Sequence, residues 1–332
     1  MYKYNYVFFW HDADYYRYAF SEILGFENVI FINKLIPDEK PFIQMLNRVH
    51  NSAKLNNIVK LPGRKLWSEV YFNDSFTKKK PIVFIFNSEY YRLRSIDYFS
   101  YLRGKYPGCK CIMFLTDTVD RYKYSFSGKF YGDYDIEYIK NNFDMVISYN
   151  MSDVERYGLT YYPLIYSNVS TECVDITSDV FFVGRAKDRL DLLHSIYLQL
   201  VSAGFRCDFY ITKVENEQML EKSGIKYNHK LDYKQVIDHI NSSNAILEIV
   251  QGGSNGFTLR LDEALVFNKV LITNNPIVDT IPYSNSPKII RISDKINFTR
   301  DDFVKRCAGN FDYKGEYSPK NLLSFLERSF AA

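Results

Sequence analysis

The stretch 244–276 constrains the fold of this chain more than any other part of it. It holds two short apolar runs, 245–250 and 269–273, each bounded by turn residues. Short continuous apolar runs are typical of parallel strands that are buried on both faces. A glycine-rich loop, 251–256, follows the first run and leads into a helix that begins after Thr258. Because loops at the carboxyl ends of parallel strands are ligand-binding positions, the stretch predicts a binding site in an α/β sheet.

The same alternation of short strands and helices runs along the whole chain. It predicts mostly parallel sheets that are covered by helices and joined by right-handed crossovers. The expected strands are 4–10, 28–32, 82–86, 109–115 and 145–148 in a first series, and 180–183, 207–212, 225–228, 245–250, 269–273 and 289–292 in a second. The expected helices of the second series include 188–203, 215–223 and 233–242.

The periodicity fades between the two series, in a polar segment that contains proline, and this marks a hinge. With 332 residues the chain is long enough for two domains, each with its own core. We therefore expect two Rossmann-like domains at 1–165 and 179–315, a linker at 166–178 and an amphipathic C-terminal helix at 316–332.

Composition excludes several classes of protein. A hydrophobic content of 46% with 24% charged residues excludes a disordered or collagen-like chain. A net charge of +3 is too small to imply a nucleic-acid partner. Five cysteines without regular spacing favour reduced thiols in the cytoplasm. No apolar run approaches the roughly 18 residues that a membrane span needs, so we expect a soluble or peripheral protein.

The expected strand 180–183 runs directly into Gly184 and Arg185. A glycine at this point lets the backbone turn tightly, and the free N–H groups of the following helix attract anions. Lys187 and Arg189 add two cations. Together these residues suit a diphosphate, whereas the structural alternative is a solvated helix start.

The helix after the glycine-rich loop begins with residues that suit a ligand site. Thr258 suits the N-cap position, and Arg260 and Glu263 lie one turn apart near the helix start. We expect both charged side chains to face the loop's ligand. The structural alternative for Glu263 is an exposed first-turn glutamate that the helix dipole favours.

This segment resembles the donor-binding loop of two-domain glycosyltransferases of the GT-B fold, in which a loop containing glycine leads into a helix with a glutamate followed by a small residue. In many retaining members two glutamates stand eight residues apart. Glu263-Ala264 matches the second glutamate, but position 255 holds Asn. The stereochemical outcome is therefore left open.

A narrower resemblance is carried by GFTLRLDEALVFNKVLITNN and by FDMVISYNMSDVERYGLTYYPLIYS at 143–167. These segments are similar to a family of bacterial capsule and lipopolysaccharide biosynthesis proteins of the glycosyltransferase type, over well under half of the chain. The resemblance implies two domains that face each other across a cleft, and it leaves open whether the final helix returns to the first domain. The donor site that it implies consists of Gly184, Arg185, Lys187, Tyr233, Asn255, Gly256, Thr258, Arg260 and Glu263.

In that fold the connection before Tyr233 lines the pocket for the nucleotide base, while the structural alternative for Tyr233 is a core position. The implied activity is a metal-independent transfer of a sugar from a nucleotide-sugar co-substrate, with no other cofactor, to a surface polysaccharide acceptor on a lipid carrier. Two rival hypotheses stay open: a nucleotide-sugar epimerase of the same fold, and an inert regulator or scaffold that binds the nucleotide sugar.

The segment after the first expected strand offers a catalytic base. His11, Asp12 and Asp14 imitate the Asp-X-Asp metal motif of GT-A glycosyltransferases, but only ten residues precede them, too few for the nucleotide-binding region that precedes that motif. In a GT-B protein this loop faces the cleft, so one of the three would deprotonate the acceptor. An ordinary helix-capping loop is the alternative.

Basic and aromatic residues are interleaved in the middle of the first domain. Arginines at 92, 94 and 103 alternate there with tyrosines at 90, 91, 98 and 101. Such a surface suits anionic headgroups at the inner face of a membrane, whereas a solvated helix face is the simpler alternative.

Overall fold

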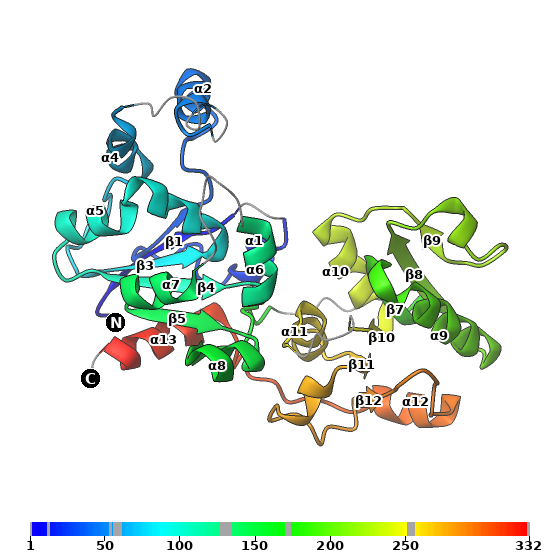
Figure 1. Ribbon diagram of the computed structural model, residues 1–332. Helices are drawn as coiled ribbons and strands as arrows, with labels where there is room; N and C mark the ends of the chain where they lie inside the picture. Colours follow the sequence, from blue (N-terminus) through cyan, green and yellow to red (C-terminus); the bar gives the residue numbers. More distant parts are fainter. Residues whose placement is uncertain are drawn as a thin grey trace. The chain divides into compact units, whose positions relative to one another are not determined.

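The computed structural model describes residues 2–11, 14–52, 55, 62–126, 135–169, 174–250 and 256–330. The chain divides into two compact units, each with its own six-stranded parallel sheet (Figure 1). The first unit consists of Met1–Arg17, Ile23–Pro163 and Leu322–Ala332, and the second of Tyr18–Glu22 and Leu164–Asn321. The predicted fold class, α/β with two Rossmann-like units, is confirmed. The placement of the two units across a cleft stays a prediction.

The sheet of the first unit has the order β2-β1-β3-β4-β5-β6. The neighbouring inner strands β1 and β3 have no exposed residue, which explains their continuous apolar sequences. The strand order reverses between β1 and β3, so the ligand-binding position of this sheet lies at their carboxyl ends. The strands are β1 (Asn5–Phe9), β2 (Val29–Ile32), β3 (Ile82–Asn87), β4 (Lys110–Leu115), β5 (Met145–Ser148) and β6 (Thr160–Tyr161).

Aromatic side chains fill much of the first unit's core. Phe9 and Phe86, on neighbouring strands, stack with ring centroids 4.6 Å apart, and Phe99 meets Phe86 edge to face at 5.1 Å. The helices of this unit are α1 (Tyr16–Ala19), α2 (Pro41–His50), η1 (Arg64–Leu66), α4 (Trp67–Tyr71), η2 (Ser88–Ile96), α5 (Tyr98–Lys105), α6 (Val119–Phe126), α7 (Ile136–Asn142), α8 (Met151–Tyr157) and α13 (Pro319–Phe330).

Helix α13 packs its final residues into the first unit, which answers the question that the sequence left open. Leu322, Leu323 and Leu326 are completely buried. Glu327 Oε1 accepts hydrogen bonds from the Lys3 backbone N–H at 2.7 Å and from the Tyr6 hydroxyl at 2.8 Å. The last helix therefore holds the segment that leads into β1.

The sheet of the second unit has the order β12-β11-β10-β7-β8-β9. Numbered from β7, this is the Rossmann order 3-2-1-4-5-6, with its reversal between β7 and β10. These two strands pair directly, with Val180 opposite Ala245. The strands are β7 (Ser178–Arg185), β8 (Cys207–Thr212), β9 (Lys226–Tyr227), β10 (Ser243–Glu248), β11 (Val270–Thr273) and β12 (Ile289–Arg291).

The helices of the second unit agree with the sequence only in part. The expected helix at 215–223 is wrong, because the chain forms a single 3-10 turn and leaves it through Lys222 in the left-handed region, at φ 56°. The sequence also failed to predict α12, a polar helix with one buried side chain, Phe303. The helices are η3 (Lys187–Arg189), α9 (Leu190–Ser202), η4 (Asn216–Gln218), α10 (Tyr233–Asn241), α11 (Leu259–Val266), η5 (Pro276–Asp279) and α12 (Arg300–Cys307).

None of the helices in the described part of the chain combines the length and the apolar character that crossing a bilayer requires.

Candidate functional site

The strongest candidate site lies in the second unit, where β7 and β10 end side by side. In an open parallel sheet, ligands bind outside the carboxyl ends of the two strands at which the order reverses. β7 ends there with Gly184 and Arg185, and β10 ends with Glu248. The sequence named the first two as site residues from local spacing alone, and the topology brings Glu248 to the same place.

Two arginines cross over this point in opposite directions. Arg189, in η3 after β7, donates a hydrogen bond from Nη1 to the carbonyl of Ile249, directly after β10. Arg260, in α11 after β10, donates from Nη2 to the carbonyl of Val183 in β7 at 3.1 Å. Arg189, which follows β7, therefore reaches the end of β10, and Arg260, which follows β10, reaches the end of β7. Together they place two cations at the reversal point of the sheet.

Arg189 has a poorly compensated positive charge. Burial lowers the pKa of its guanidinium, and the positive charge of Arg260 lowers it further. Within the described residues Arg189 forms no ion pair, and its buried Nε has no hydrogen-bond partner there. An anion bound at this point would relieve both costs.

Arg260 is held by a buried carboxylate. Glu263 is 0% exposed, and its Oε2 accepts a hydrogen bond from Arg260 Nη1. Its Oε1 accepts from the Tyr233 hydroxyl at 2.8 Å. Burial lowers the pKa of Arg260, but the neighbouring Glu263 outweighs this and raises the pKa above its usual value. The arrangement fixes the guanidinium, which remains 22% exposed.

This geometry changes the role expected of Glu263 and Tyr233. The Tyr233 hydroxyl also lies 2.9 Å from that of Tyr166, and because a phenol carries one proton, Tyr166 donates to Tyr233 while Tyr233 donates to Glu263. Burial and then the charge of Glu263 raise the pKa of Tyr233 well above its usual value. In this conformation Glu263 is fully buried and holds Arg260, and its contact with the donor stays a prediction.

The sequence did not indicate Glu248 as a site residue, yet its carboxylate connects several segments around the site. It is buried and accepts hydrogen bonds from the hydroxyls of Thr258 and Thr273 and, at 3.2 Å, from Asn275 Nδ2. Thr258 also caps α11, because its hydroxyl accepts from the Leu261 backbone N–H at 3.4 Å. A single carboxylate thus joins the ends of β10 and β11 to the start of α11.

The loop that carries the remaining predicted donor residues is described only at its end. Asn255 lies outside the described residues. Gly256 is buried, and its carbonyl accepts a hydrogen bond from Asn275 Nδ2 at 3.0 Å, which ties the loop's last residue to the same network.

The edge of the site carries exposed cations on a tightly packed turn. Arg185 and Lys187 are exposed, and Lys187 adopts φ 51°, a conformation that residues other than glycine rarely take. A Cβ atom at Gly184 would lie 3.1 Å from Phe182 Cζ and 3.2 Å from Arg189 Nη2. Glycine is therefore needed here because Arg189 passes close to the backbone.

Asp262 stands beside Glu263 in a very different environment. It is buried, and neither of its carboxyl oxygens has a hydrogen-bond partner in the described part of the chain. Burial, followed by the charge of Glu263, raises the pKa of Asp262 well above its usual value. This carboxyl group is therefore held in its neutral form.

The first unit has a second group of candidate residues, at its own reversal point. His11 follows β1, Glu89 follows β3, and His11 Nε2 forms an ion pair with Glu89 Oε2. The sequence named His11 as a candidate base but did not identify Glu89 as its partner. Asp14 is exposed, and Asp12 lies outside the described residues.

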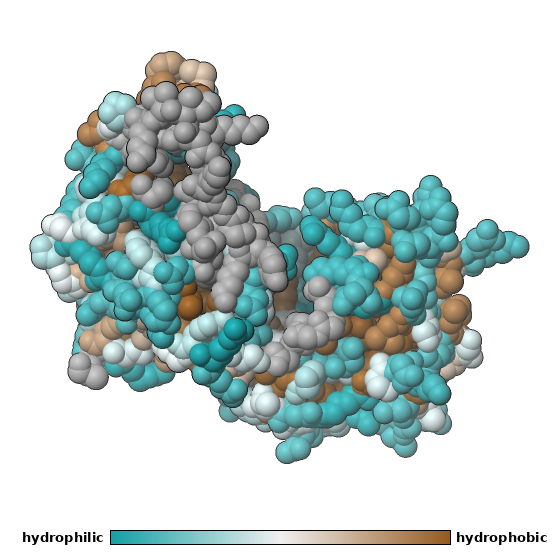
Figure 2. All heavy atoms as spheres, viewed as in Figure 1, coloured by the Kyte–Doolittle hydropathy of each residue, from teal (hydrophilic) through white to brown (hydrophobic). Residues whose placement is uncertain are grey.

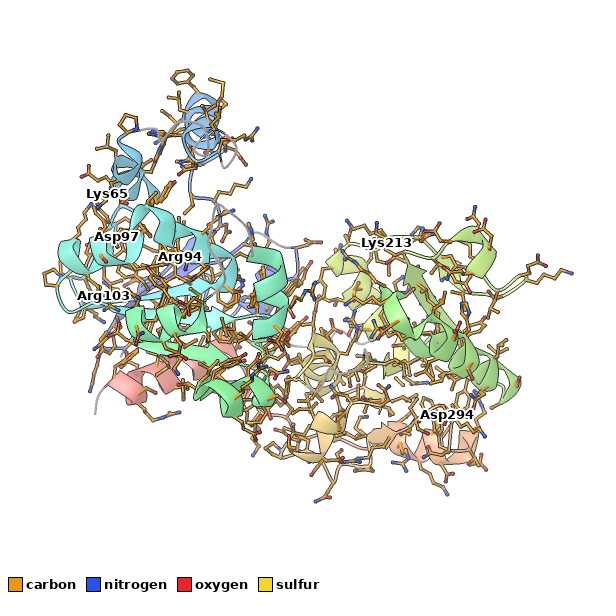
Figure 3. The ribbon with its side chains drawn as sticks, viewed as in Figure 1. Lys65, Arg94, Asp97, Arg103, Lys213 and Asp294 are labelled. Carbon is orange, nitrogen blue, oxygen red and sulfur yellow. The ribbon has the colours of Figure 1, made fainter. Side chains whose placement is uncertain are left out.

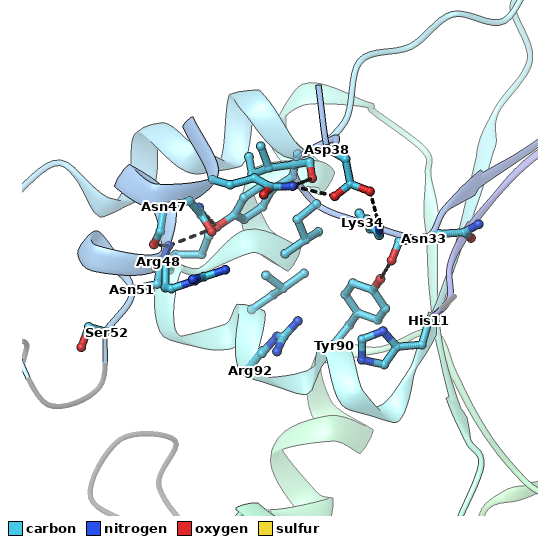
Figure 4. Close-up of a pocket in the computed structure, with 16 residues that line it drawn as sticks. His11, Asn33, Lys34, Asp38, Asn47, Arg48, Asn51, Ser52, Tyr90 and Arg92 are labelled. Carbon is cyan, nitrogen blue, oxygen red and sulfur yellow. Dashed lines mark hydrogen bonds and ion pairs between the residues drawn. The ribbon is translucent and has the colours of Figure 1, made fainter. Parts of the chain in front are cut away.

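A pocket of 780 Å³ opens beside His11 (Figure 4). Its floor is apolar, and Arg48 from α2 and Arg92 from η2 extend into it (Figure 4). The Tyr90 hydroxyl donates to the carbonyl of Asn33 at 3.3 Å and closes one side of the pocket. A ligand in this pocket would meet cations and apolar side chains together.

The predicted basic and aromatic surface is wrong in its aromatic part. Tyr90, Tyr91 and Tyr98 are buried in the core of the first unit, because the segment packs them against the sheet. Arg103 is bound to Asp144 at 2.9 Å, and Arg94 lies over the ring of Tyr91. Tyr90, Tyr91 and Tyr98 are therefore not part of an exposed aromatic surface, whereas Tyr101 is half-buried.

No protein-family model matches the chain, and no curated protein matches it either. Among solved structures, one match is the DNA-modifying enzyme beta-glucosyltransferase, studied with and without its substrate uridine diphosphoglucose, at 14% identity and a TM-score of 0.37, covering 77% of this chain and 78% of that one. Another is the glycosyltransferase SnogD from Streptomyces nogalater, at 9% identity and a TM-score of 0.40, covering 98% and 95%. At these values neither similarity assigns an activity to this chain.

Proposed function

We propose that this protein is a glycosyltransferase that moves a sugar from a nucleotide-activated donor to an acceptor hydroxyl. The observation that carries the proposal is the pair of crossed arginines, Arg189 and Arg260, at the reversal point of a Rossmann-ordered sheet. This is the position at which such sheets bind nucleotides, and the cations suit the donor's diphosphate.

The diphosphate is the leaving group, so its negative charge grows as the bond to the sugar breaks. Arg189 and Arg260 would stabilise that charge from within the site, and Arg185 and Lys187 from its edge. Four cationic side chains supply the stabilisation that a divalent metal provides in other transferases, so we propose a metal-independent reaction. Glu263, which is itself bonded to the Tyr233 hydroxyl, holds Arg260 in place before the donor binds.

The acceptor half of the reaction is proposed for the first unit. In the neutral form of His11 that donates Nε2–H to Glu89, Nδ1 carries the lone pair of the imidazole, and this atom would take the proton of the acceptor hydroxyl. The acceptor oxygen then forms a bond to the sugar's anomeric carbon, the bond from that carbon to the phosphate oxygen breaks, and the nucleoside diphosphate leaves with the electron pair.

The class of acceptor is proposed from the pocket beside His11. Its cations and apolar floor suit a saccharide on a phosphate-bearing lipid carrier, as in the assembly of surface polysaccharides at the inner face of a bacterial membrane. The two rival functions differ in their products. An epimerase would interconvert nucleotide sugars without an acceptor, and a scaffold would bind the nucleotide sugar without turnover.

The donor site is tested by removing exposed cations that do not support the fold. We expect the double variant Arg185→Gln, Lys187→Gln to bind its nucleoside diphosphate about ten-fold more weakly, because hydrogen bonds to charged groups contribute about 1.5–3 kcal/mol. Calorimetric titration with UDP, GDP, dTDP and CMP measures this and identifies the base.

The matched control is Lys213→Gln. Lys213 follows β8 (Figure 3), is exposed, and has a φ of 63°, close to that of Lys187, but lies outside the reversal point. Its replacement should leave binding unchanged. Equal affinities in the double variant and the wild type would contradict this donor site.

A separate experiment distinguishes the rival functions. After incubation with nucleotide sugars, product analysis separates transfer or slow hydrolysis from epimerisation and from binding without turnover.

A further inference from the structure

Helix α2 has no buried residue. Helices in globular proteins owe most of their stability to packing of an apolar face, so a ten-residue helix without such packing lacks its usual support. Its apolar side chains Phe42, Met45, Leu46 and Val49 are instead between 40% and 63% exposed. They recur at i, i+3, i+4 and i+7, so they lie on one face of the helix, and that face is turned to solvent.

The neighbouring segment adds to this apolar surface. The indole N–H of Trp67 in α4 donates to His50 Nδ1 at the end of α2, at 2.8 Å, which ties the two helices together. Leu66 and Val70, beside that tryptophan, are also largely exposed. Figure 2 shows apolar surface gathered over α2, at the top of the view. Exposed apolar groups concentrated in one place mark an interaction surface.

The segment around α2 also concentrates positive charge. Those residues of 33–71 that the structure describes include five Lys or Arg against three Asp or Glu, a formal charge of +2. Lys40 and Arg48 are exposed on or next to the helix, and Lys65 is exposed in η1 (Figure 3). The partner of this surface is therefore anionic. A second copy of the chain would bring two positive faces together.

The polar face of the same helix forms part of the pocket beside His11. Gln44, Asn47, Arg48 and Asn51 line that pocket from α2 (Figure 4). One helix thus presents an apolar face to the outside and a polar, cationic face to a cavity. This is the composition of helices that lie in the plane of a membrane interface.

We propose that α2 docks the protein on an anionic lipid bilayer. Phe42, Met45, Leu46 and Val49 enter the boundary between headgroups and acyl chains, while the exposed Lys40 and Lys65 beside the helix bind lipid phosphates. The proposal deepens the proposed function by naming the surface that meets the membrane. The membrane proposal rests on the exposed side chains of α2, and vesicle binding is measured without a sugar donor. Either proposal can therefore fail while the other stands.

The test is sedimentation of the full chain with vesicles of phosphatidylcholine alone and of phosphatidylcholine mixed with phosphatidylglycerol. We expect the wild type to bind the mixed vesicles, and the double variant Phe42→Ser, Leu46→Ser to bind them roughly ten-fold more weakly. Lys40→Gln, Lys65→Gln should weaken binding to the mixed vesicles and reduce its dependence on salt.

The controls are Leu198→Ser in α9 and Val304→Ser in α12, which remove apolar side chains of comparable exposure from the second unit. Both should bind like the wild type. Equal binding by the Phe42, Leu46 variant and the wild type would overturn the proposal. So would a wild-type dimer in light scattering that this variant abolishes, because the surface would then belong to a second copy. Unchanged circular dichroism confirms that the variants are folded.

Discussion

Asp262 and Glu263 are adjacent carboxyl residues of α11 with opposite surroundings. Glu263 has a guanidinium and a phenol as partners, whereas Asp262 has no hydrogen-bond partner within the described residues. An unpartnered buried polar group costs about 1–3 kcal/mol. Burial and the charge of Glu263 raise the pKa of Asp262 well above its usual value, whereas Glu263 forms an ion pair with Arg260.

The raised pKa of Asp262 predicts a dependence of stability on pH. Above the unfolded value of about 3.9 the unfolded state loses the Asp262 proton while the folded state keeps it. The folded state then binds more protons, so its free energy of unfolding falls as pH rises. In Asp262→Asn this side chain cannot titrate, so its contribution to the fall in the free energy of unfolding disappears. We expect the variant to gain at least about 1 kcal/mol over the wild type between pH 4 and pH 7, since one pKa unit corresponds to about 1.4 kcal/mol.

Urea unfolding of both proteins across that range measures the difference, and groups that titrate equally in the two proteins cancel. Glu263, Tyr166 and Tyr313 are the titratable neighbours, and none of them is changed by the substitution. Stability curves that run parallel from pH 4 to pH 7 would show that Asp262 is ionised in the folded state.

Single residues were predicted well where their role is local and poorly where it depends on a distant partner. Thr258 was expected to cap its helix, and it does, because a cap is defined by the next three residues. The pairing of His11 with Glu89 depends on the register of β1 against β3, and the reach of Arg189 to Ile249 depends on β7 lying beside β10. No local pattern in the sequence contains that information.

At the scale of elements, burial decided what the sequence could predict. The strands β5 and β8 were predicted with their observed bounds, because strands buried in a parallel sheet have short apolar runs with clear ends. The helix expected at 215–223 has only one 3-10 turn, and α12 was not predicted at all because its sequence is polar. Helices supported mainly by capping give a weak periodic signal.

The turn from β7 into η3 gives a prediction for this element. Gly184→Ala places a Cβ atom 3.1 Å from Phe182 Cζ and 3.2 Å from Arg189 Nη2, so both side chains must give way by a few tenths of an ångström. We expect a loss of about 1 kcal/mol in stability, as for other overpacked sites, and a roughly ten-fold loss of nucleoside diphosphate affinity. Thermal unfolding and calorimetric titration measure the two effects.

Gly104→Ala in α5 is the matched control. An added Cβ atom meets nothing within 4 Å there, and Gly104 has helical backbone angles, so alanine should raise stability by up to about 1 kcal/mol without changing affinity. If Gly184→Ala behaved like this control, the close approach of Arg189 would not be needed for binding.

At the scale of the whole molecule, the chain forms two separate cores, and its C-terminal residues return to the first unit. The cores draw on different strands and helices, and the part of α13 from Leu322 onward belongs to the first unit although it follows the second unit in sequence. The sequence predicted this helix and its apolar residues. It left the docking open, because an amphipathic pattern shows that a face is buried but not which surface covers it.

The return of α13 predicts which unit a mutation at the C-terminus weakens. Leu326→Ala removes a completely buried side chain, which costs about 2–5 kcal/mol. Hydrogen exchange should speed up in β1 and β3, whereas β7 and β10 should keep their protection. Leu200→Ala in α9, equally buried in the second core, should give the reverse pattern. Because the two substitutions are chemically identical, faster exchange of β7 and β10 in the Leu326 variant would mean that α13 supports the second unit instead.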